Sequence, residues 1–461
     1  MSIFKVLNQE TMSHLTTTSK IMKFVNQTIS SQLEGWAEML LQGDLYSYEQ
    51  GLFSCMNGIY DFISEELLPS VSCQVIDKLV EQGRASGGRK IEVRPFTFRI
   101  ATGREVKVQS PYVRKPGKAW SGSRHLLAGH WNVIGGASPA LYDRVGFCAA
   151  LGPSYDVAHQ ALGKFGATLC LSSVRDLTNR LADHCFDYGE ENLMLEPSET
   201  LADKRVAIAV DGGRTRTRTY EGEVNQAGQL MYQTEWCEPK LFVIEVLNNE
   251  GRPSRHELPI YGCRFKKGHV LNLLGRYLRT LEIDKAEQVQ ILGDGAGWIW
   301  NNIKPMLLGL NVDSNRIVES LDYYHASQYV HSLVDQMPKR IGQNRRKAYL
   351  SQFKDWLWKG AAGQIVEECK TVYKRPGDLV ERWINYLDKH QDKTQYAVYE
   401  ENKLMCGSGI IESGIRRIIN LRFKNASTFW EKGTVEKLYF LRAALLSKRW
   451  DTVMINLSNS T

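Results

Sequence analysis

The sequence predicts an α/β core, a mixed five-stranded sheet flanked by helices, that carries a helical insertion and follows an N-terminal α+β region. Three observations predict this fold class. Between residues 204 and 321, short apolar runs alternate with segments of helical periodicity. The segment 341–395 is polar, helical in pattern and rich in Lys, Arg and Trp, as a helical insertion would be. Residues 1–83 have helical periodicity, and a basic, strand-like pattern follows them.

The core is expected to have three strands, then a helix, a strand, a helix and a last strand. The expected strands are 206–210, 222–232, 240–246, 289–292 and 316–321, and the expected helices are 270–281 and 298–308. The expected domains are 1–83, 84–130, 131–200, 204–340, 341–395 and 396–461, with the core formed by 204–340 and 396–461.

The segment 1–83 is expected to be a small helical bundle. Its first helical pattern is carried by Leu33, Trp36, Met39 and Leu40. A second pattern begins at Leu52 and is expected to break at Pro69, because proline removes a helical hydrogen bond.

The segment 84–130 is expected to be a basic β-hairpin with its basic residues on one side. Residues 91–100 alternate like a strand, 102–103 turn the chain, and 105–109 return. Pro95 indicates that its strand lies at an edge. Between 84 and 124 the chain has eleven Lys and Arg against two Glu, which exceeds the net charge of +7 of the whole chain. Such a patch fits the DNA backbone, although a solvated basic hairpin is the alternative. The candidate contacts are Arg94, Arg99, Lys107, Arg114 and Lys115.

The segment 131–200 has the layout of a helix-turn-helix, although a plain helical hairpin fits as well. Residues 154–165 predict one helix, 166–167 break it, and Ser172 is expected to cap a second. The side chains that would face a DNA groove are Gln160, Ser173, Arg175, Thr178, Asn179 and Arg180.

No apolar run is long enough to span a bilayer, and the start of the chain lacks the apolar region of a secretory signal. The nine cysteines are odd in number, widely spaced and without a Cys-x-x-Cys pair. These features exclude a disulfide framework and a zinc ribbon as expectations, and they favour a cytoplasmic protein with no membrane partner.

Three acidic residues occupy settings that favour metal chemistry. Asp211 and Asp294 each end an apolar strand and precede a glycine, and Glu412 lies near the start of an expected helix. Carboxylates at strand ends and on a helix can converge at one edge of a sheet, where they would bind two Mg²⁺ ions, with Mn²⁺ able to substitute. The alternative for each aspartate is a turn or helix-cap residue, and for Glu412 a pair with Arg416.

The spacing agrees with this hypothesis. Asp211 and Asp294 are 83 residues apart, which leaves room for three strands and a helix. The 118 residues from Asp294 to Glu412 require an inserted domain. Asp322 closes the last expected strand, and His325 would then open a helix near the site. His325 is a candidate phosphate contact or proton carrier, and Asp322 a residue that assists the site or orients His325. A structural helix cap and a buried histidine are the alternative.

These motifs resemble the DDE transposases of the RNase H-like superfamily. The resemblance spans about 204–450 and is closest to the bacterial ISKra-type group. It rests on four pieces in order: Val210-Asp211-Gly212-Gly213-Arg214, then Gly293-Asp294-Gly295-Ala296-Gly297-Trp298-Ile299, then Asp322-Tyr323-Tyr324-His325, which is similar to the C/D-x-x-H element of Mutator-like transposases, and then Gly407-Ser408-Gly409-Ile410-Ile411-Glu412-Ser413 with Arg422, Lys424, Trp430 and Leu441-Arg442-Ala443.

The resemblance implies binding of double-stranded DNA at transposon ends and target, metal-dependent strand cleavage and strand transfer, and a homodimer or larger assembly in a bacterial, nucleoid-associated setting. Asp211, Asp294 and Glu412 would bind the metals. The expected phosphate contacts beside them are Arg214, Arg416, Arg417, Arg422 and Lys424. A nuclease or resolvase without strand transfer, and a transposase-derived DNA-binding regulator, are the alternatives.

Overall fold

The computed structural model describes residues 3–85, 90–114, 124–424 and 429–459. The chain divides into two compact units. One contains Met1–Cys185 and Met454–Thr461, and the other is Phe186–Val453.

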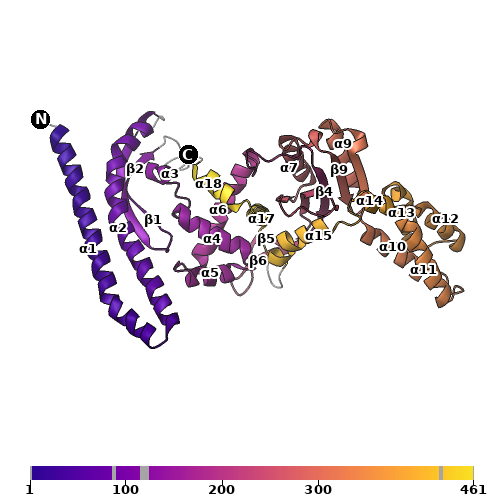
Figure 1. Ribbon diagram of the computed structural model, residues 1–461, viewed down its shortest axis with the longest axis horizontal. Helices are drawn as coiled ribbons and strands as arrows, with labels where there is room; N and C mark the ends of the chain where they lie inside the picture. The colour runs from indigo at the N-terminus through magenta and orange to yellow at the C-terminus, as the bar shows by residue number, and fades with distance from the viewer. Residues whose placement is uncertain (1–2, 86–89, 115–123, 425–428, 460–461) are drawn as a thin grey trace. The chain divides into compact units, whose positions relative to one another are not determined.

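The first unit begins with two long helices, α1 (Ile3–Leu41) and α2 (Leu45–Ala85), which lie side by side as a helical hairpin (Figure 1). The described part of the segment 1–83 is helical as expected, but the predicted break of the second helix at Pro69 was wrong, because α2 continues through Pro69 for another sixteen residues. Leu33 and Leu40, which carry the first helical pattern, are 54% and 46% exposed. Two helices can cover only one face of each other, so apolar positions on the remaining faces stay in contact with solvent.

A three-stranded antiparallel sheet follows, formed by β1 (Lys90–Arg99), β2 (Glu105–Arg114) and β3 (Arg124–His125) in that order. It confirms the predicted hairpin and the edge position of Pro95. The expected basic side of the hairpin is wrong. Arg94 pairs with Ser110 on the face that contains buried Phe98, whereas Lys107 pairs with Thr97 on the opposite face. Successive side chains of a strand point to opposite faces, so Arg94 and Thr97 of β1 lie on different faces. Lys107 lies on the face of its partner Thr97.

Four helices complete the described part of this region, and the last of them crosses into the second unit. They are α3 (Leu126–His130), α4 (Pro139–Leu151), α5 (Tyr155–Lys164) and α6 (Leu171–Glu191). Ser154 caps α5, but α6 begins before Ser172, the expected cap. Thr178 is fully buried and its hydroxyl donates to the Val174 carbonyl, so it does not face a groove.

The second unit is built on a mixed five-stranded sheet in the order β10-β9-β4-β7-β8. The strands are β4 (Arg205–Gly212), β7 (Lys240–Leu247), β8 (Ile260–Arg264), β9 (Gln288–Gly293) and β10 (Ile317–Leu321). β4, β9 and β10 are parallel, and β7 runs antiparallel to β4 and β8. The predicted five-stranded mixed sheet is therefore confirmed.

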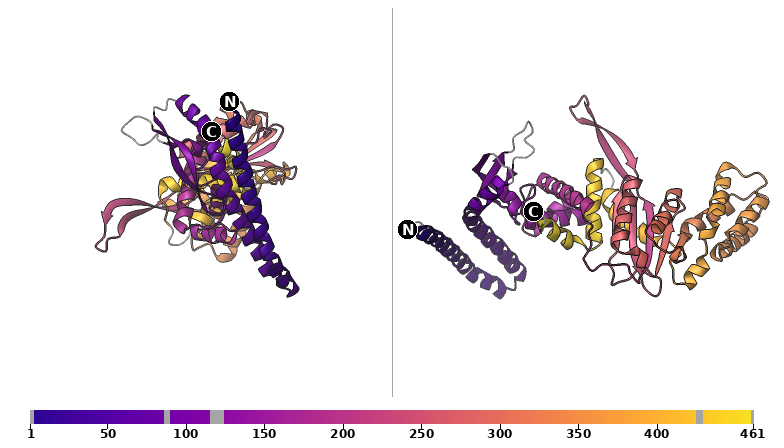
Figure 2. Two further views of the ribbon diagram at one scale, coloured as in Figure 1. Left: turned by 90° about the vertical axis from the view of Figure 1, so that its left-hand side faces the viewer. Right: turned by 90° about the horizontal axis from the view of Figure 1, so that it is seen from above.

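One expected strand of this sheet is wrong. Residues 222–232 contain the turn of a separate hairpin, β5 (Thr215–Val224) and β6 (Leu230–Cys237), which extends away from the sheet (Figure 2). The fifth place is taken by β8, which contains Gly262. A Cβ atom on Gly262 would lie 2.3 Å from the ring of Phe242, so the close strand contact needs a glycine that weakens the local strand pattern.

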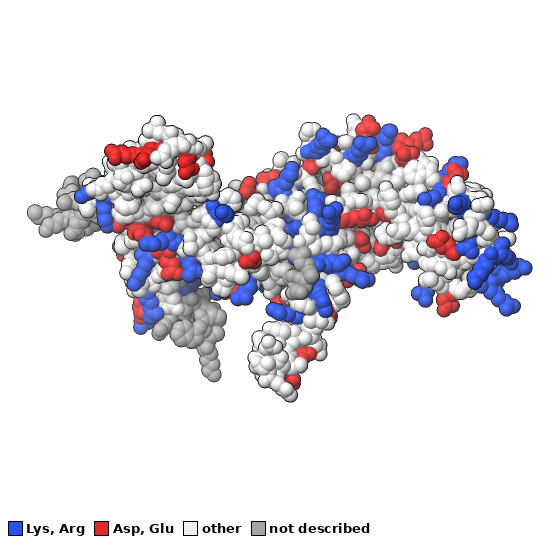
Figure 3. Space-filling view, turned by 90° about the horizontal axis from the view of Figure 1, so that it is seen from below, with Lys and Arg blue, Asp and Glu red and all other residues white. Residues whose placement is uncertain are grey.

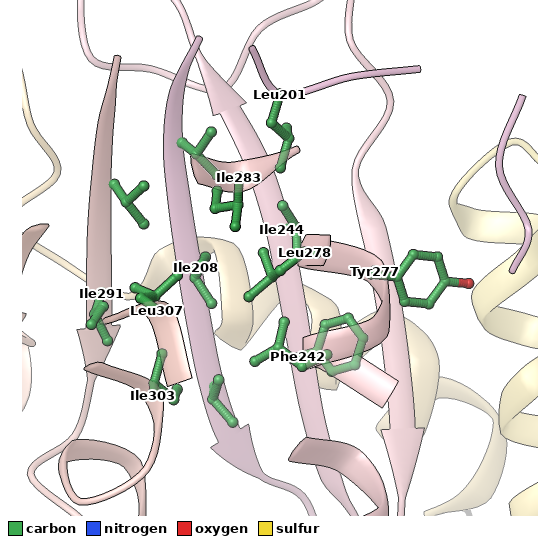
Figure 4. Close-up of a cluster of buried hydrophobic side chains, with 14 of the residues drawn as sticks. Leu201, Ile208, Phe242, Ile244, Tyr277, Leu278, Ile283, Ile291, Ile303 and Leu307 are labelled. Carbon is green, nitrogen blue, oxygen red and sulfur yellow. The ribbon is translucent and has the colours of Figure 1, made fainter. Parts of the chain in front are cut away.

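The main core lies on one face of the sheet. Alternate side chains of β4, β7 and β9, including Ile208, Phe242 and Ile291, point toward side chains of two covering helices, α7 (Lys267–Thr280) and α9 (Ile303–Gly309) (Figure 4). The other short helices on this side are η1 (Ile283–Lys285), α8 (Gly297–Trp300) and η2 (Ser314–Arg316). The expected helix 298–308 is thus divided between α8 and α9.

Helices from the end of the chain contact the sheet's other face. They are α15 (Gly409–Ile415) and α17 (Lys432–Leu446). The π-helical turn η4 (Arg416–Asn420) and α16 (Leu421–Phe423) lie between them in the chain, and α18 (Trp450–Asn459) follows α17. The helix α15 packs on β4 and β7. Gly414 permits this approach, because an added Cβ would lie 3.1 Å from both Leu241 and Tyr261.

The helical insertion has its own buried core. It contains α10 (Tyr323–Asp335), α11 (Gln343–Trp358), α12 (Ala362–Val372), α13 (Asp378–His390), η3 (Gln391–Lys393) and α14 (Tyr396–Glu401). The predicted boundary at 395 is too early, because Tyr396 and Tyr399 of α14 are buried in this core. Their aromatic packing could not be assigned from the polar pattern around them.

Within the described ranges, no helix is both long and apolar enough to cross a membrane. All nine cysteines are free.

Replacing Gly414 with alanine should lower the free energy of unfolding by about 1–3 kcal/mol, because the new methyl group forces α15 away from β7 and β8. The matched control is Gly409→Ala on the same helix, where an added Cβ meets nothing within 4 Å. The control should change stability by at most about 1 kcal/mol, in the stabilising direction. Equal urea midpoints for the two variants would contradict this account of the helix contact.

Candidate functional site

Asp211 and Asp294 lie side by side at the carboxyl ends of two adjacent parallel strands. Paired residues of β4 and β9, such as Ala209 and Leu292, are 83 positions apart, and the same offset connects Asp211 to Asp294. Adjacent strands are roughly 4.8 Å apart, and residues in register project from the same face. The spacing that the sequence showed is therefore the register of the sheet.

Asp322 extends this row to a third strand. Leu321 of β10 pairs with Gly293 of β9, so Asp322 is in register with Asp294. The backbone N–H of Asp322 donates to the Gly293 carbonyl at 2.9 Å. The prediction that Asp322 closes a strand beside Asp294 is confirmed, and three carboxyl side chains share one edge and one face of the sheet.

The surroundings of Asp211 disfavour the ionised form of its carboxyl group. Burial raises its pKa to about 6. The hydrogen bond from the Gly212 N–H, at 2.6 Å, opposes that rise, and the negative charge of Asp294 adds to it. A carboxyl group with this pKa gives up its proton only at a cost, and a nearby cation would remove that cost.

Both oxygens of the Asp322 carboxylate accept hydrogen bonds from the protein. It is fully buried, and it caps α10 by accepting the His325 backbone N–H at Oδ1 over 2.7 Å. Its Oδ2 accepts the Ser408 backbone N–H at 2.6 Å and the Ser408 hydroxyl. Burial raises the pKa of Asp322, but the hydrogen bonds from His325 and Ser408 outweigh it and hold the pKa at about 2.

His325 opens α10, as predicted, and lies against Asp322. Its Nδ1 is 3.4 Å from Asp322 Oδ1, a distance for ionic contact rather than a short hydrogen bond. The side-chain contact with Asp322 raises the pKa of His325, burial opposes it, and the charges of Asp294 and Asp211 add to the rise. The imidazole therefore stays protonated to a higher pH than usual. Its positive charge is attracted by the carboxylates of Asp322, Asp294 and Asp211.

The segment before Glu412 is fixed to the sheet by polar contacts. Gln290, fully buried on β9, donates to the Met405 carbonyl at 2.6 Å and accepts the Met405 N–H at 2.9 Å. The Tyr323 N–H donates to the Cys406 carbonyl at 3.0 Å. Together with the contact between Ser408 and Asp322, these bonds determine where the chain re-enters the core and where α15 begins.

Glu412 is brought to the same place. Ligand atoms of Glu412, Asp322 and His325 all lie within 4.8 Å of one another. In the part of the chain that the structure describes, no other three such groups are so close, so Asp211, Asp294 and Glu412 are not drawn together at metal-ligand spacing. Glu412 is exposed, and a π-helical turn follows its helix, a feature that is frequent at functional sites.

The chemistry of these side chains, though not their spacing in this structure, fits a hard divalent cation. Asp211, Asp294 and Glu412 supply the carboxylate oxygens that Mg²⁺ and Mn²⁺ prefer, whereas both oxygens of Asp322 are already hydrogen-bonded. His325 is a weaker candidate ligand, because its contact with Asp322 favours the protonated ring.

The insertion supports the loop that carries Asp294. The hydroxyl of Tyr386 on α13 donates to the Asp294 carbonyl at 2.8 Å. Gly295 has φ +94°, and a Cβ there would lie 2.5 Å from the Tyr386 ring. No pattern in the sequence indicates Tyr386, and the only hint of Gln290 is a polar residue within an apolar run.

The expected phosphate contacts near the acidic residues divide into three groups. Arg214, Arg416 and Lys424 are exposed and remain available for DNA. Arg417 is half-buried and donates to the Tyr261 hydroxyl. Arg422 is 2% exposed and stacks on Trp430, so its assignment as a DNA contact is wrong. A basic residue in an amphipathic pattern can point toward solvent or toward the core. Here Arg422 points toward the core and packs on the ring of Trp430.

The expected contacts in the first unit are partly engaged already. Arg94 pairs with Glu92 at 2.5 Å and stacks on Tyr112. Arg99 pairs with Glu105 at 2.9 Å, and Lys107 is exposed. The side chain of Arg114 and all of Lys115 lie outside the described residues.

The chain matches no protein-family model, and no curated protein matches it. Among solved structures, the Drosophila P element transposase strand transfer complex is similar over 70% of this chain and 81% of that chain, at 12% sequence identity and a TM-score of 0.25. So low a TM-score supports neither a fold nor a function.

Asp211→Asn should raise the free energy of unfolding at pH 7 by up to about 3 kcal/mol and change it by less than about 1 kcal/mol near pH 4. The folded pKa of about 6 lies above the usual 3.8, so ionisation costs stability as the pH rises through this window. Urea unfolding at both pH values measures the effect. The control Asp284→Asn, at an exposed position, should show no such pH dependence, and a uniform shift in both variants would contradict the prediction.

Asp322→Asn should have the opposite pH dependence. Because the folded pKa of about 2 lies below the usual 3.8, the ionised group stabilises the fold above that window and loses its effect as the pH falls toward 2. The variant should lose about 2 kcal/mol or more of stability at pH 7, and the difference from the unsubstituted protein should shrink between pH 4 and pH 3. A loss that is the same at every pH would indicate a packing defect instead.

Proposed function

We propose that this protein is a DNA transposase of the DDE type, which cleaves and joins DNA strands with divalent metal ions. The observation that carries the proposal is the row of acidic groups at one edge of the sheet. Asp211 and Asp294 are in register on adjacent parallel strands, and Glu412 comes to the same edge beside His325 from the opposite end of the second unit's sequence.

The topology of the sheet supports this proposal. The first strand, β4, has the antiparallel strands β7 and β8 on one side and the parallel strands β9 and β10 on the other. That arrangement is what the resemblance to the RNase H-like superfamily leads one to expect. A helical insertion lies between β10 and the helix that carries Glu412, as the spacing of the motifs requires.

Asp211, Asp294 and Glu412 would hold the metal ions. The raised pKa of Asp211, which burial causes and the charge of Asp294 increases, supports this assignment, because a bound cation would stabilise the ionised carboxylate. Two divalent ions would lower the pKa of an attacking water and neutralise charge on the phosphate and the leaving oxygen.

The proposed reaction has two steps of the same kind. A water oxygen attacks phosphorus in line, the bond from phosphorus to the 3′ oxygen breaks, and a 3′-hydroxyl and a 5′-phosphate remain. That hydroxyl then attacks a phosphorus of target DNA and displaces its 3′ oxygen. His325, whose pKa is raised by Asp322, is the group available to bind the phosphate or to give a proton to the displaced oxygen.

Asp322 acts as a positioning residue in this proposal. Its oxygens orient the first turn of α10 and the Ser408 end of α15, so it sets the distance between His325 and Glu412 without contacting the substrate. The exposed cations Arg214, Arg416 and Lys424 would hold the DNA backbone, and cutting two ends together calls for a homodimer or larger assembly.

Metal-dependent nicking of a labelled duplex that carries the element's terminal repeat tests the proposal. Asp294→Asn and Glu412→Gln should each slow nicking by roughly a hundredfold to a thousandfold, since each removes several kcal/mol of charge stabilisation. Asp284→Asn should retain full activity, and Mg²⁺ should raise the urea midpoint of the unsubstituted protein but not that of Asp211→Asn.

The products separate the candidate functions. Joined strands support a transposase, and nicks without joining support a nuclease or resolvase. Tight binding without cleavage by any variant, and no stabilisation by Mg²⁺, would reject metal catalysis and favour a DNA-binding regulator.

A further inference from the structure

One end of the helical insertion carries a second concentration of positive charge. Between residues 339 and 375 the chain has ten Lys and Arg against three Asp and Glu, a net charge of +7 that equals that of the whole chain. Figure 3 shows Lys and Arg gathered at the far end of the insertion. This concentration lies on α11, α12 and their loops, outside the acidic site and outside the basic segment 84–124.

Three short stretches of the insertion supply the exposed cations. They are the loop before α11, the first turns of α11, and the loop after α12, and we call their side chains the insertion patch: Lys339, Arg340, Arg345, Lys347, Lys374 and Arg375. Among the described residues, none of the six forms an ion pair with an acidic side chain. By contrast, Lys359 and Lys370 of the same insertion pair with Asp355 and Glu367 at 2.8 and 2.6 Å.

The loops that carry the insertion patch are braced against each other by hydrogen bonds. Arg340 donates to the Val372 carbonyl at 3.0 Å, which joins the loop before α11 to the end of α12. Arg346 donates to the Asp335 carbonyl at 2.7 Å and to the Met337 carbonyl at 2.5 Å, which joins α11 to the end of α10. These two arginines therefore maintain the fold, and they hold the other cations of the insertion patch at one place.

The patch is unfavourable unless an anion binds to it. Arg345 and Arg346 lie in the first turn of α11, which has no acidic residue and no side-chain cap. Cations at the positive end of a helix dipole are destabilising, and like charges repel across the loops. A phosphate backbone would reverse both effects, because it is attracted by the cations and by the N–H groups of the helix end.

We propose that the insertion patch binds the backbone of duplex DNA, at a place separate from the acidic residues. This inference deepens the proposed function and rests on it, since a protein that joins two DNA segments must hold DNA beyond the reacting phosphates. The patch acts through charge and so adds affinity without sequence preference.

The test is the salt dependence of binding to a duplex of arbitrary sequence, in EDTA and with Asp294→Asn present in every protein, so that no cleavage occurs. The slope of log affinity against log salt is negative, and each phosphate contact contributes about −0.9 to it. Lys347→Gln with Lys374→Gln should therefore bring the slope closer to zero by about 2. With Arg345→Gln and Arg375→Gln added, the slope should be closer to zero by about 3–4 in total, and the affinity should fall by about tenfold or more.

The matched control is Lys359→Gln with Lys370→Gln, which removes the same charge from paired lysines of the same insertion. It should change the slope by less than 1, and all variants should keep the parent's circular dichroism spectrum and melting temperature. Equal slopes for the patch and control variants would overturn the proposal. Binding is measured without metal, so its result does not depend on whether the acidic residues catalyse cleavage. Equal slopes would reject DNA binding by the insertion patch without contradicting the proposed role of the acidic residues.

Discussion

The contact between Asp322 and Ser408 is the constraint on which the rest of the second unit's acidic edge depends. Asp322 ends the last strand of the sheet, and Ser408 comes just before the helix that carries Glu412. The helical insertion separates them in the chain, so no local preference could keep the two ends in place. A buried carboxylate that accepts three hydrogen bonds can do so, because leaving any of its partners unmet would cost stability.

The other polar contacts on this face serve the same purpose. Gln290 is a buried amide in the middle of a strand, and both of its polar atoms are used to hold Met405. Gly414 lets α15 approach β7 and β8 closely. One face of the sheet thus has a conventional apolar core, whereas the other uses small side chains and directed hydrogen bonds to position a single helix.

Stability and chemistry oppose each other at this edge. Asp211 and Asp294 repel, and burial makes the charge of Asp211 costly, while Asp322 is held ionised and stabilises the fold. The insertion contributes as well, since Tyr386 supports the Asp294 loop and α10 begins with His325. A site that is destabilised until a cation binds is consistent with the proposed chemistry, and the insertion patch is a similar case in which unpaired charge favours an external partner.

The sequence by itself determined the mixed five-stranded sheet, the strand ends at Asp211, Asp294 and Asp322, the helix that begins near His325, and the existence of a helical insertion. These are predictable because periodicity, chain spacing and turn residues are local signals. The tertiary structure alone decided that β8 rather than 222–232 enters the sheet, that α2 continues through Pro69, and that Arg422 is buried. It also decided that both oxygens of Asp322 accept hydrogen bonds, and that Glu412 lies close to Asp322 and His325. Each of these depends on which partner a residue meets after folding, and that choice is made by packing and burial across the fold rather than by neighbours in the chain.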